Sequence, residues 1–513
     1  MTSTRRLIIL TLITSFLLVG SRSAFADYKQ ARAMFAKKNY EKAAALYHEV
    51  YEKSDNKADK RKAEWGLAQS LQKLGLLYSA SKYYSLIVRR GRTEDNPFFR
   101  SALEELGNIN SKLSLGRSHV VQLFKTEIRL SDVPGPARGF YFYYKGVEAF
   151  GARSLEVAEK HFGMVPAGSP YQLGALFHEG VIANLKGRHS RSIALFEKVL
   201  AGTRDKSEYR ELQEMSLMNI ARVNYEIKRF PEAISYYGQI PRDSDNWLDA
   251  IWEASWAFFF MEKFNNSLGN IHTIHSPFFE NRFYPEAYIL QSITFLRMCR
   301  YDQVKESMRR FKDRYQPVFG DVKGMLNRYR GDPKGFFKFV YDYNNGSMSS
   351  YRRAEEIVKK LSMIDAFKEA MDTIRFTDRE LNNLKNFGGW GPSGLLESLT
   401  NFLESKKSAA VLDAGQRMYK EGTTYYTELL ELSNQTKLIV AEMQLGKLAN
   451  LRSMIKVGDD ERKVQFIGGM QKLNINQTLE YWPFEGEYWE DELGFYVYNM
   501  ASKCTTKDDD GDK

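Results

Sequence analysis

Small and bulky apolar residues recur with helical spacing along the first three-fifths of the chain, and the whole pattern repeats. One small residue recurs at Ala31, Ala68, Gly146, Gly180, Ala221, Ser255 and Ser292. Twelve residues later, a second and mostly small position follows at Ala43, Ala80, Ala158, Ser192, Ala233, Ser267 and Val304. Bulky and then apolar residues come four and seven positions after that, as in Tyr47 with Val50 and Phe196 with Val199. Small residues let two helix backbones approach closely and bulky residues fill the space beside them, so the pattern predicts a series of helix pairs.

The copies are mostly about 34 to 41 residues apart, and the step from Ala68 to Gly146 is about twice as long. The long step leaves room for a degenerate copy around Gly107, Val120 and Phe124. In period and in these columns, residues 27–317 resemble the tetratricopeptide repeat family, whose helix pairs repeat every ~34 residues. The resemblance implies an all-α fold in which about eight helix pairs wind into a right-handed superhelical solenoid. It also implies that the first helix of each pair lines a concave groove that binds partner proteins or peptides.

Positions near the small first-helix residue correspond to the groove positions of the family. In this sequence, the candidate partner-binding residues are Tyr28, Trp65, Tyr143, Phe177, Arg222, Trp252, Trp256 and Phe259. Aromatic side chains supply large rigid contact area and Arg fixes orientation, which suits recognition of an extended or helical segment. The alternative is that these aromatic side chains pack one repeat against the next. The chain is richer in Tyr and Phe than the family pattern and often lacks the proline that ends a repeat.

The last third of the chain has a different pattern. Loop residues surround an aromatic segment in 318–350, which we expect to be a junction. Residues 351–460 predict long helices interrupted by Gly388 to Pro392. A packed helical domain is the preferred interpretation, with a helical hairpin or a coiled-coil arm as alternatives. Residues 461–504 combine aromatic and acidic residues and suggest a short cap, and 505–513 form an acidic tail that we expect to be disordered.

The N-terminus carries the features of a secretory signal over residues 1–26. Arg5 and Arg6 precede the apolar run from Leu7 to Gly20, and Ala24-Phe25-Ala26 provides the small residues of a cleavage site. An uncleaved membrane anchor is the alternative. Cleavage removes three arginines and no acid, which lowers the formal charge from +10 to +7. We therefore expect an exported protein, in the periplasm of a Gram-negative bacterium, with no membrane span after cleavage and no nucleic-acid partner.

Candidate chemistry is sparse. The two cysteines, Cys299 and Cys504, are too few for a disulfide framework, and whether they pair is left open, with a buried Cys299 favoured. His272 and His275 share one helical face, but without neighbouring ligands we expect no metal and no cofactor. The phosphate-binding, dinucleotide-binding, nucleophile-elbow and zinc-protease motifs are not found, so we expect no enzyme.

The block from Trp482 to Glu492 supplies the rival interpretations. Its carboxylates beside Trp482 and Trp489 admit either an enzyme that acts on peptidoglycan or a glycan-binding adaptor. Trp482 and Trp489 are therefore a possible second contact. The preferred interpretation is an exported protein–protein interaction scaffold of the cell envelope, which binds partner peptides or helices in the repeat groove.

Overall fold

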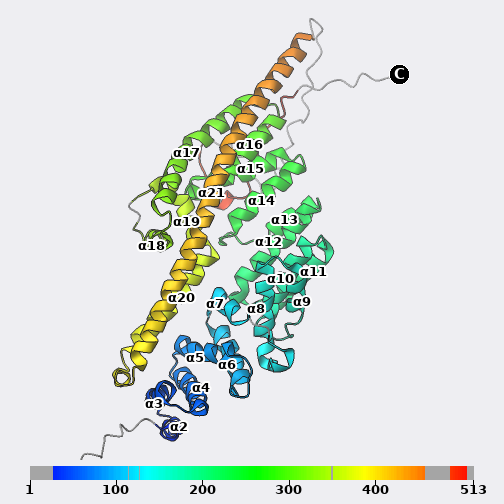
Figure 1. Ribbon diagram of the computed structural model, residues 1–513. Coiled ribbons are helices and arrows are strands. Elements are labelled where there is room, and N and C mark those ends of the chain that lie inside the picture. The colour runs from blue at the N-terminus through cyan, green and yellow to red at the C-terminus, as the bar shows by residue number, and fades with distance from the viewer. Residues whose placement is uncertain (1–26, 114, 126–127, 348–349, 457–485, 505–513) are drawn as a thin grey trace, which may run out of the picture. The chain divides into compact units, whose positions relative to one another are not determined.

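The computed structural model (Figure 1) describes residues 27–113, 115–125, 128–347, 350–456 and 486–504. Every regular element in these ranges is a helix, so the predicted all-α fold class is confirmed. The predicted signal peptide, Trp482, the acidic tail and most of the predicted cap before residue 486 lie outside the described residues. Among the described helices, none is both long and apolar enough to cross a membrane.

The chain divides into two compact units. Unit 1 comprises Met1–Glu148 and Glu369–Ala410, and unit 2 comprises Ala149–Lys368 and Val411–Lys513. Helices α8, α20 and α21 contain the boundary residues and contribute to both units.

Helix pairs in chain order make up the N-terminal part of unit 1, and part of the C-terminal region packs on them. The paired helices are α2 (Tyr28–Ala36), α3 (Tyr40–Lys53), α4 (Lys57–Lys73), α5 (Leu77–Arg89), α6 (Phe99–Lys112), α7 (Arg117–Leu123) and α8 (Arg138–Gly151). The C-terminal contribution is α20 (Asp365–Leu384), the turn Gly388–Trp390 and α21 (Leu395–Lys456). Buried Trp390 stacks on Phe387 at 4.4 Å between ring centroids and donates its indole N–H to the Glu41 carbonyl at 3.0 Å. The predicted break at Gly388 to Pro392 is therefore an ordered packing element.

Unit 2 continues the pairs and adds its own C-terminal helices. Its elements are α9 (Leu155–Gly163), α10 (Gln172–Leu185), α11 (His189–Thr203), α12 (Arg210–Glu226), α13 (Phe230–Tyr237), α14 (Trp247–Phe260), α15 (Phe264–Ile274), α16 (Glu286–Arg297), α17 (Tyr301–Arg328), α18 (Pro333–Asn344) and α19 (Glu355–Met363). From α9 to α17 each helix packs against the next one in the chain. This succession is the helical-repeat arrangement that the sequence pattern predicts.

The columns of small residues have the packing role that the sequence pattern assigns to them. A Cβ atom on Gly180 of α10 would lie only 2.8 Å from a ring carbon of Phe196 in α11. Ser192 of α11 donates its hydroxyl to the Gly180 carbonyl at 2.8 Å. Gly66 of α4, two residues before the column residue Ala68, meets the Tyr47 ring of α3 in the same way, at 2.5 Å. A larger side chain at these glycines would separate the helices.

The turn between the two helices of a pair has a constant geometry. The residue seven positions after the small first-helix residue has positive φ, between 55° and 80°, at Lys38, Gly75, Arg153, Gly187, Lys228, Glu262 and Cys299. The next residue donates its N–H to the carbonyl five positions earlier in each case, for example Lys263 to Phe258 at 2.9 Å. These are Schellman C-caps, and only two of the seven positions carry the glycine that this conformation favours.

Two element boundaries differ from the sequence-based expectation. Pro317, expected to end the repeat array, lies inside α17, which continues to Arg328. The helix continues because Tyr315, Val318 and Val322 keep a buried apolar face across the proline. Residues 395–456 form one helix of 62 residues, about 93 Å long at 1.5 Å per residue, and no hairpin.

A C-terminal strap, residues 486–504, lies on α15 and α16 of unit 2. A disulfide joins its Cys504 to Cys299. The backbones of Tyr498 and Met500 bond to Asn265, and Arg300 donates to the Ala501 carbonyl. The pairing that the sequence leaves open is therefore present, and Cys299, expected to be buried, is only partly buried.

The two neighbouring histidines are both part of the packing, His272 against the strap and His275 against α16. The His272 ring stacks on Tyr488 at 4.6 Å between centroids, and His275 stacks on Tyr288 at 4.0 Å. Burial lowers the pKa of His272 to about 4 and the pKa of His275 to about 3, so both rings are neutral and part of the packing.

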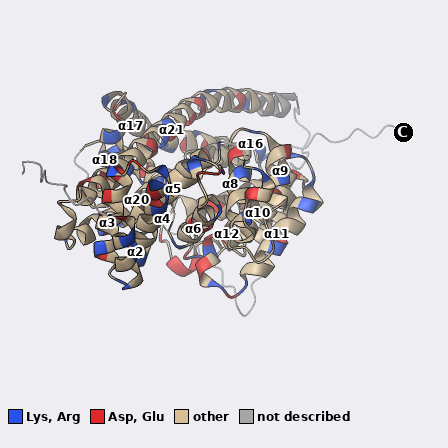
Figure 2. Cartoon of the chain, turned by 60° about the horizontal axis from the view of Figure 1, so that its bottom comes forward, with Lys and Arg blue, Asp and Glu red and all other residues tan. Residues whose placement is uncertain are grey.

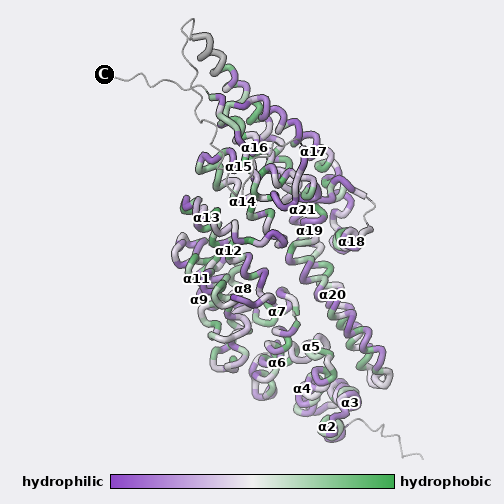
Figure 3. The backbone as a smooth tube through the Cα atoms, turned by 180° about the vertical axis from the view of Figure 1, so that it is seen from behind, coloured by the Kyte–Doolittle hydropathy of each residue, from purple (hydrophilic) through white to green (hydrophobic). Residues whose placement is uncertain are grey.

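Acidic and basic side chains are interspersed along the helices, as Figure 2 shows. Apolar and polar residues likewise alternate along most helices in Figure 3, as expected when one side of a helix is packed.

Candidate interaction cleft in unit 2

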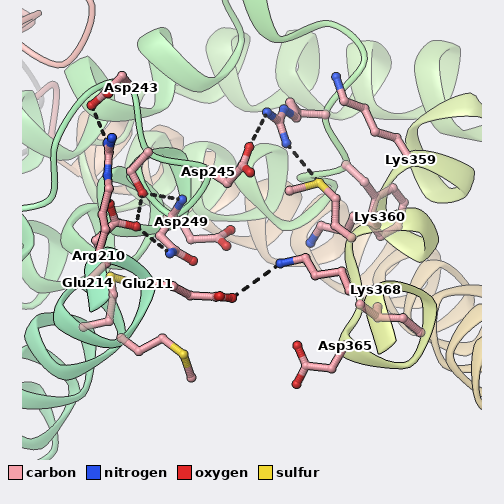
Figure 4. Close-up of a pocket in the computed structure, with 18 of the residues that line it drawn as sticks. Arg210, Glu211, Glu214, Asp243, Asp245, Asp249, Lys359, Lys360, Asp365 and Lys368 are labelled. Carbon is pink, nitrogen blue, oxygen red and sulfur yellow. Dashed lines mark hydrogen bonds and ion pairs between the residues drawn. The ribbon is translucent and has the colours of Figure 1, made fainter. Parts of the chain in front are cut away.

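A cleft of about 760 Å³ lies in unit 2 between the first helices α12 and α14 and the short helix α19. Loop residues 243–246 and 282–284, the start of α20 and Tyr425 of α21 complete its lining. Figure 4 shows a mainly acidic wall that faces a mainly basic one, with Arg210 on the acidic side and Asp365 beside Lys368 on the basic side. The volume is within the ~300–1,000 Å³ usual for ligand-binding pockets.

The acidic wall comes from α12, the 243–246 loop and α14. Its residues are Glu211, Glu214, Asp243, Asp245 and Asp249. The amphipathic face of α12 explains its position, because Met218 and Ala221 are in the core while Glu211 is exposed.

Glu214 is the buried anchor of this wall. Its carboxylate accepts hydrogen bonds from Arg210 Nε at 2.9 Å, Ser244 Oγ at 2.5 Å and Asn246 Nδ2 at 3.0 Å. Burial acts to raise the pKa of Glu214, but the bonds from Ser244, Arg210 and Asn246 together hold it below its usual value. Glu214 therefore stays ionised and fixes the loop that carries Asp243 and Asp245.

The basic wall comes from α19 and the start of α20. Its residues are Lys359, Lys360 and Lys368, with Arg282 from the preceding loop. Lys359 lies near Arg282, and burial together with this like charge lowers the pKa of Lys359. The Lys360 ammonium lies 5.7, 5.2 and 5.8 Å from the ring centroids of Phe283, Tyr284 and Tyr425. Three rings around one ammonium fix it by cation–π attraction.

Two ion pairs connect the walls. Lys368 Nζ lies 3.4 Å from Glu211 Oε1, and Arg282 lies 3.6 Å from Asp245. In each pair the acid is largely exposed, so both are weak links that solvent and salt screen. A charged ligand can replace such pairs at little free-energy cost.

One predicted groove residue lines this cleft, and the others lie elsewhere. Arg222 of α12 is at the cleft and forms an ion pair with Glu253 at 2.6 Å. Trp252, Trp256 and Phe259 are partly buried side chains of α14 that pack against the core of unit 2. Phe177 is buried and contacts Phe196, with 5.4 Å between ring centroids.

The remaining predicted residues lie in unit 1 or in the strap. Tyr28 contacts Tyr47 at 5.9 Å, and Trp65 stacks on Phe98 at 5.3 Å between centroids. Burial raises the pKa of Tyr143 to about 12, and its ring packs edge-on against Tyr144. Trp489 is half exposed on the strap. Most of the predicted aromatic ladder therefore makes contacts within the repeats.

The sequence pattern does not predict the lysines of the basic wall as site residues. Lys359, Lys360 and Lys368 lie outside the repeats, and no repeat column contains them. The only sequence signal was a cluster of bases around 359–368 with neighbouring apolar residues. Within the described part of the chain, no group of three His, Cys, Asp or Glu is placed to hold a metal ion.

No protein-family model matches the chain, and no curated protein matches it. Among solved structures, it is similar to the crystal structure of the apo form of RapI. The likeness has a TM-score of 0.32 and 10% sequence identity, and it covers 74% of this chain and 96% of that one. With a score this low, we draw no conclusion about family or function from it.

Proposed function

We propose that the protein is an exported interaction scaffold of the tetratricopeptide type, which holds partner proteins in the bacterial cell envelope. Its unit 2 cleft binds a segment of a partner that carries both acidic and basic residues. The observation that carries the proposal is the pair of facing walls of opposite charge on α12 with α14 and on α19.

The geometry favours a charged polypeptide segment over an apolar ligand. Basic side chains of the partner face Glu211 and Asp249, and acidic ones face Lys368 and Lys359. Glu214 and the ring-enclosed Lys360 are already fixed, so binding orders few additional side chains of the scaffold.

The disulfide supports the exported location. Cys299 and Cys504 are the only cysteines of the chain and are joined to each other. Disulfides persist mainly in oxidising compartments, which agrees with the signal-like N-terminus.

The test is site-specific photocrosslinking in intact cells of the source organism. A photoreactive phenylalanine analogue replaces Met215, which lines the cleft, and a matched control replaces Leu185, an exposed apolar residue of α10 outside it. We expect discrete adducts from position 215 that are lost or reduced at least threefold when Lys368→Gln and Glu211→Gln are combined. Lys338→Gln, on the exposed side of α18, should leave them unchanged.

Three outcomes would overturn the proposal: no adduct from position 215, the same adducts from position 185, or adducts that the charge variants leave unchanged. Release of soluble fragments from purified cell-wall sacculi by the protein would instead favour the peptidoglycan-acting enzyme. Sedimentation with sacculi without release would favour the glycan-binding adaptor.

A further inference from the structure

An apolar stripe lies on the C-terminal part of α21, away from the rest of unit 2. Leu438, Leu445 and Leu448 are 66%, 67% and 50% exposed, and Ala441 between them is also exposed. In Figure 1 this orange end of α21 extends beyond α16 and α17. Solvated helices normally present polar residues outward, so a leucine stripe of this kind indicates a contact surface.

The opposite face of the same helix packs within unit 2. Ile439 is buried, and Gly446 lies against Tyr301, whose hydroxyl would be 3.0 Å from a Cβ atom there. At 100° per residue, the centre of the leucine stripe lies about 130° around the helix from this packed face. The stripe is therefore not a continuation of the internal packing.

The spacing of the stripe is that of a two-stranded coiled coil. Leu438, Ala441, Leu445 and Leu448 occupy successive a, d, a and d positions. Upstream, Glu431 and Asn434 occupy the corresponding positions, so the apolar seam begins at Leu438.

The charges beside the stripe determine which partner fits. Lys437 is at a g position and Glu442 at the e position of the next heptad, and both are exposed. In a parallel pair of helices, a g residue faces the e residue of the next heptad on the partner. Two copies of this helix therefore bring Lys437 of each against Glu442 of the other. An antiparallel pair does not bring these two together.

We propose that the chain self-associates as a parallel dimer through residues 438–448 of α21. The seam from Leu438 to Leu448 is about one and a half heptads long, so the association is weak and depends on concentration. This inference is independent of the cleft and of its partner.

The test is sedimentation of the oxidised mature chain between about 1 and 100 µM. We expect a monomer–dimer equilibrium in wild type and at least tenfold weaker dimerisation in Leu445→Glu. Lys437→Glu and Glu442→Lys should each weaken it at least threefold, and the double exchange should restore it to within about twofold. Because these positions are exposed, the variants should keep wild-type helicity by circular dichroism.

The register is tested by oxidative crosslinking. Ala441→Cys, at a d position, should form a covalent dimer, while Lys447→Cys, at a c position, should not. A monomer at every concentration, failure of the double exchange to restore dimerisation, or equal crosslinking of both cysteines would overturn the proposal. A monomeric wild type whose melting temperature falls in Leu445→Glu would show that another part of the chain covers the stripe.

Discussion

Helix α5 is capped by a side chain from a distant part of the chain, and this contact offers a direct test of unit 1. The residue before the helix, Leu76, gives no side-chain cap. Buried Glu380 of α20 instead accepts hydrogen bonds from the N–H groups of Tyr78 at 2.6 Å and Ser79 at 2.9 Å, and from Ser79 Oγ at 2.7 Å. These N–H groups are among the four that a helix leaves unpaired at its N-terminus.

The destabilisation expected on replacing Glu380 follows from the type of hydrogen bond that is lost. A hydrogen bond to a charged group contributes roughly 1.5–3 kcal/mol, and a buried donor without a partner carries a further penalty. Burial raises the pKa of Glu380, although the bonds from Ser79 and Tyr78 lower it. Burying the ionised carboxylate therefore costs free energy that these hydrogen bonds offset only in part. We therefore expect Glu380→Ala to destabilise α5 by about 3 kcal/mol and Glu380→Gln, which keeps one acceptor, by about 1 kcal/mol.

The assay is hydrogen exchange by mass spectrometry on the full chain, followed in peptides that cover Leu77–Arg89. If α5 opens locally, 3 kcal/mol corresponds to roughly 150-fold faster exchange. Glu404→Ala, an exposed change on α21, is the control and should have little effect. Unchanged protection of α5 in Glu380→Ala would refute the assignment of Glu380 as its cap.

Three further predictions address the turns, a buried acid and the strap. Glu262→Gly, at a positive-φ turn, should stabilise the chain by up to about 1 kcal/mol, and Gly187→Ala at the equivalent turn should destabilise it by about 1 kcal/mol. Denaturant unfolding measures both changes in the free energy of unfolding, and changes of the same sign would contradict the prediction. Burial, together with nearby Glu286, raises the pKa of Glu428 to about 7, so its contribution to stability is fully present below pH 4.5 and is lost as the pH rises through 7. Glu428→Gln should therefore raise the melting temperature at pH 8 but not at pH 4.5. The exposed control Glu197→Gln should show no such difference between the two pH values, and an equal effect of Glu428→Gln at both would contradict the prediction. Replacing Cys299 and Cys504 by Ser removes a crosslink across 205 residues, which is worth about 5 kcal/mol in the chain-entropy model. The strap of the double variant should therefore be digested by protease faster than the strap of the wild type. Equal digestion of the variant and the wild type would show that the disulfide does not hold the strap.

The repeat array could be predicted because its cause is local. The small residue at Gly180 and the bulky residue at Phe196 sit at fixed spacing, and each helix pair packs mainly on its neighbours in the chain. The turn positions also follow the repeat, seven residues after the small position. They were missed because residues such as Lys228 and Glu262 stand where a glycine would have marked the turn.

The contacts made by the C-terminal region could not be predicted, since they join residues far apart in the sequence. Glu380 meets Ser79 across 301 positions, and Cys504 meets Cys299 across 205. In each contact, the sequence around one residue contains nothing that identifies the residue it meets. Tyr, Phe and Trp suit both recognition and packing, and periodicity alone does not separate these uses, so the groove role of the aromatic ladder stays a prediction.

The cleft combines one wall from the repeats with one wall from helices outside them. The repeats supply the acidic wall, with Glu211 on α12 and Asp249 on α14. The opposite wall comes from α19 and α20, which lie outside the repeats and place Lys359, Lys360 and Lys368 across the cleft. Since specificity is a difference between the free energies of competing partners, the added basic wall excludes uniformly basic segments that the acidic face alone would accept. In this protein we therefore expect the non-repeat helices, rather than the groove aromatics, to determine which partner is bound.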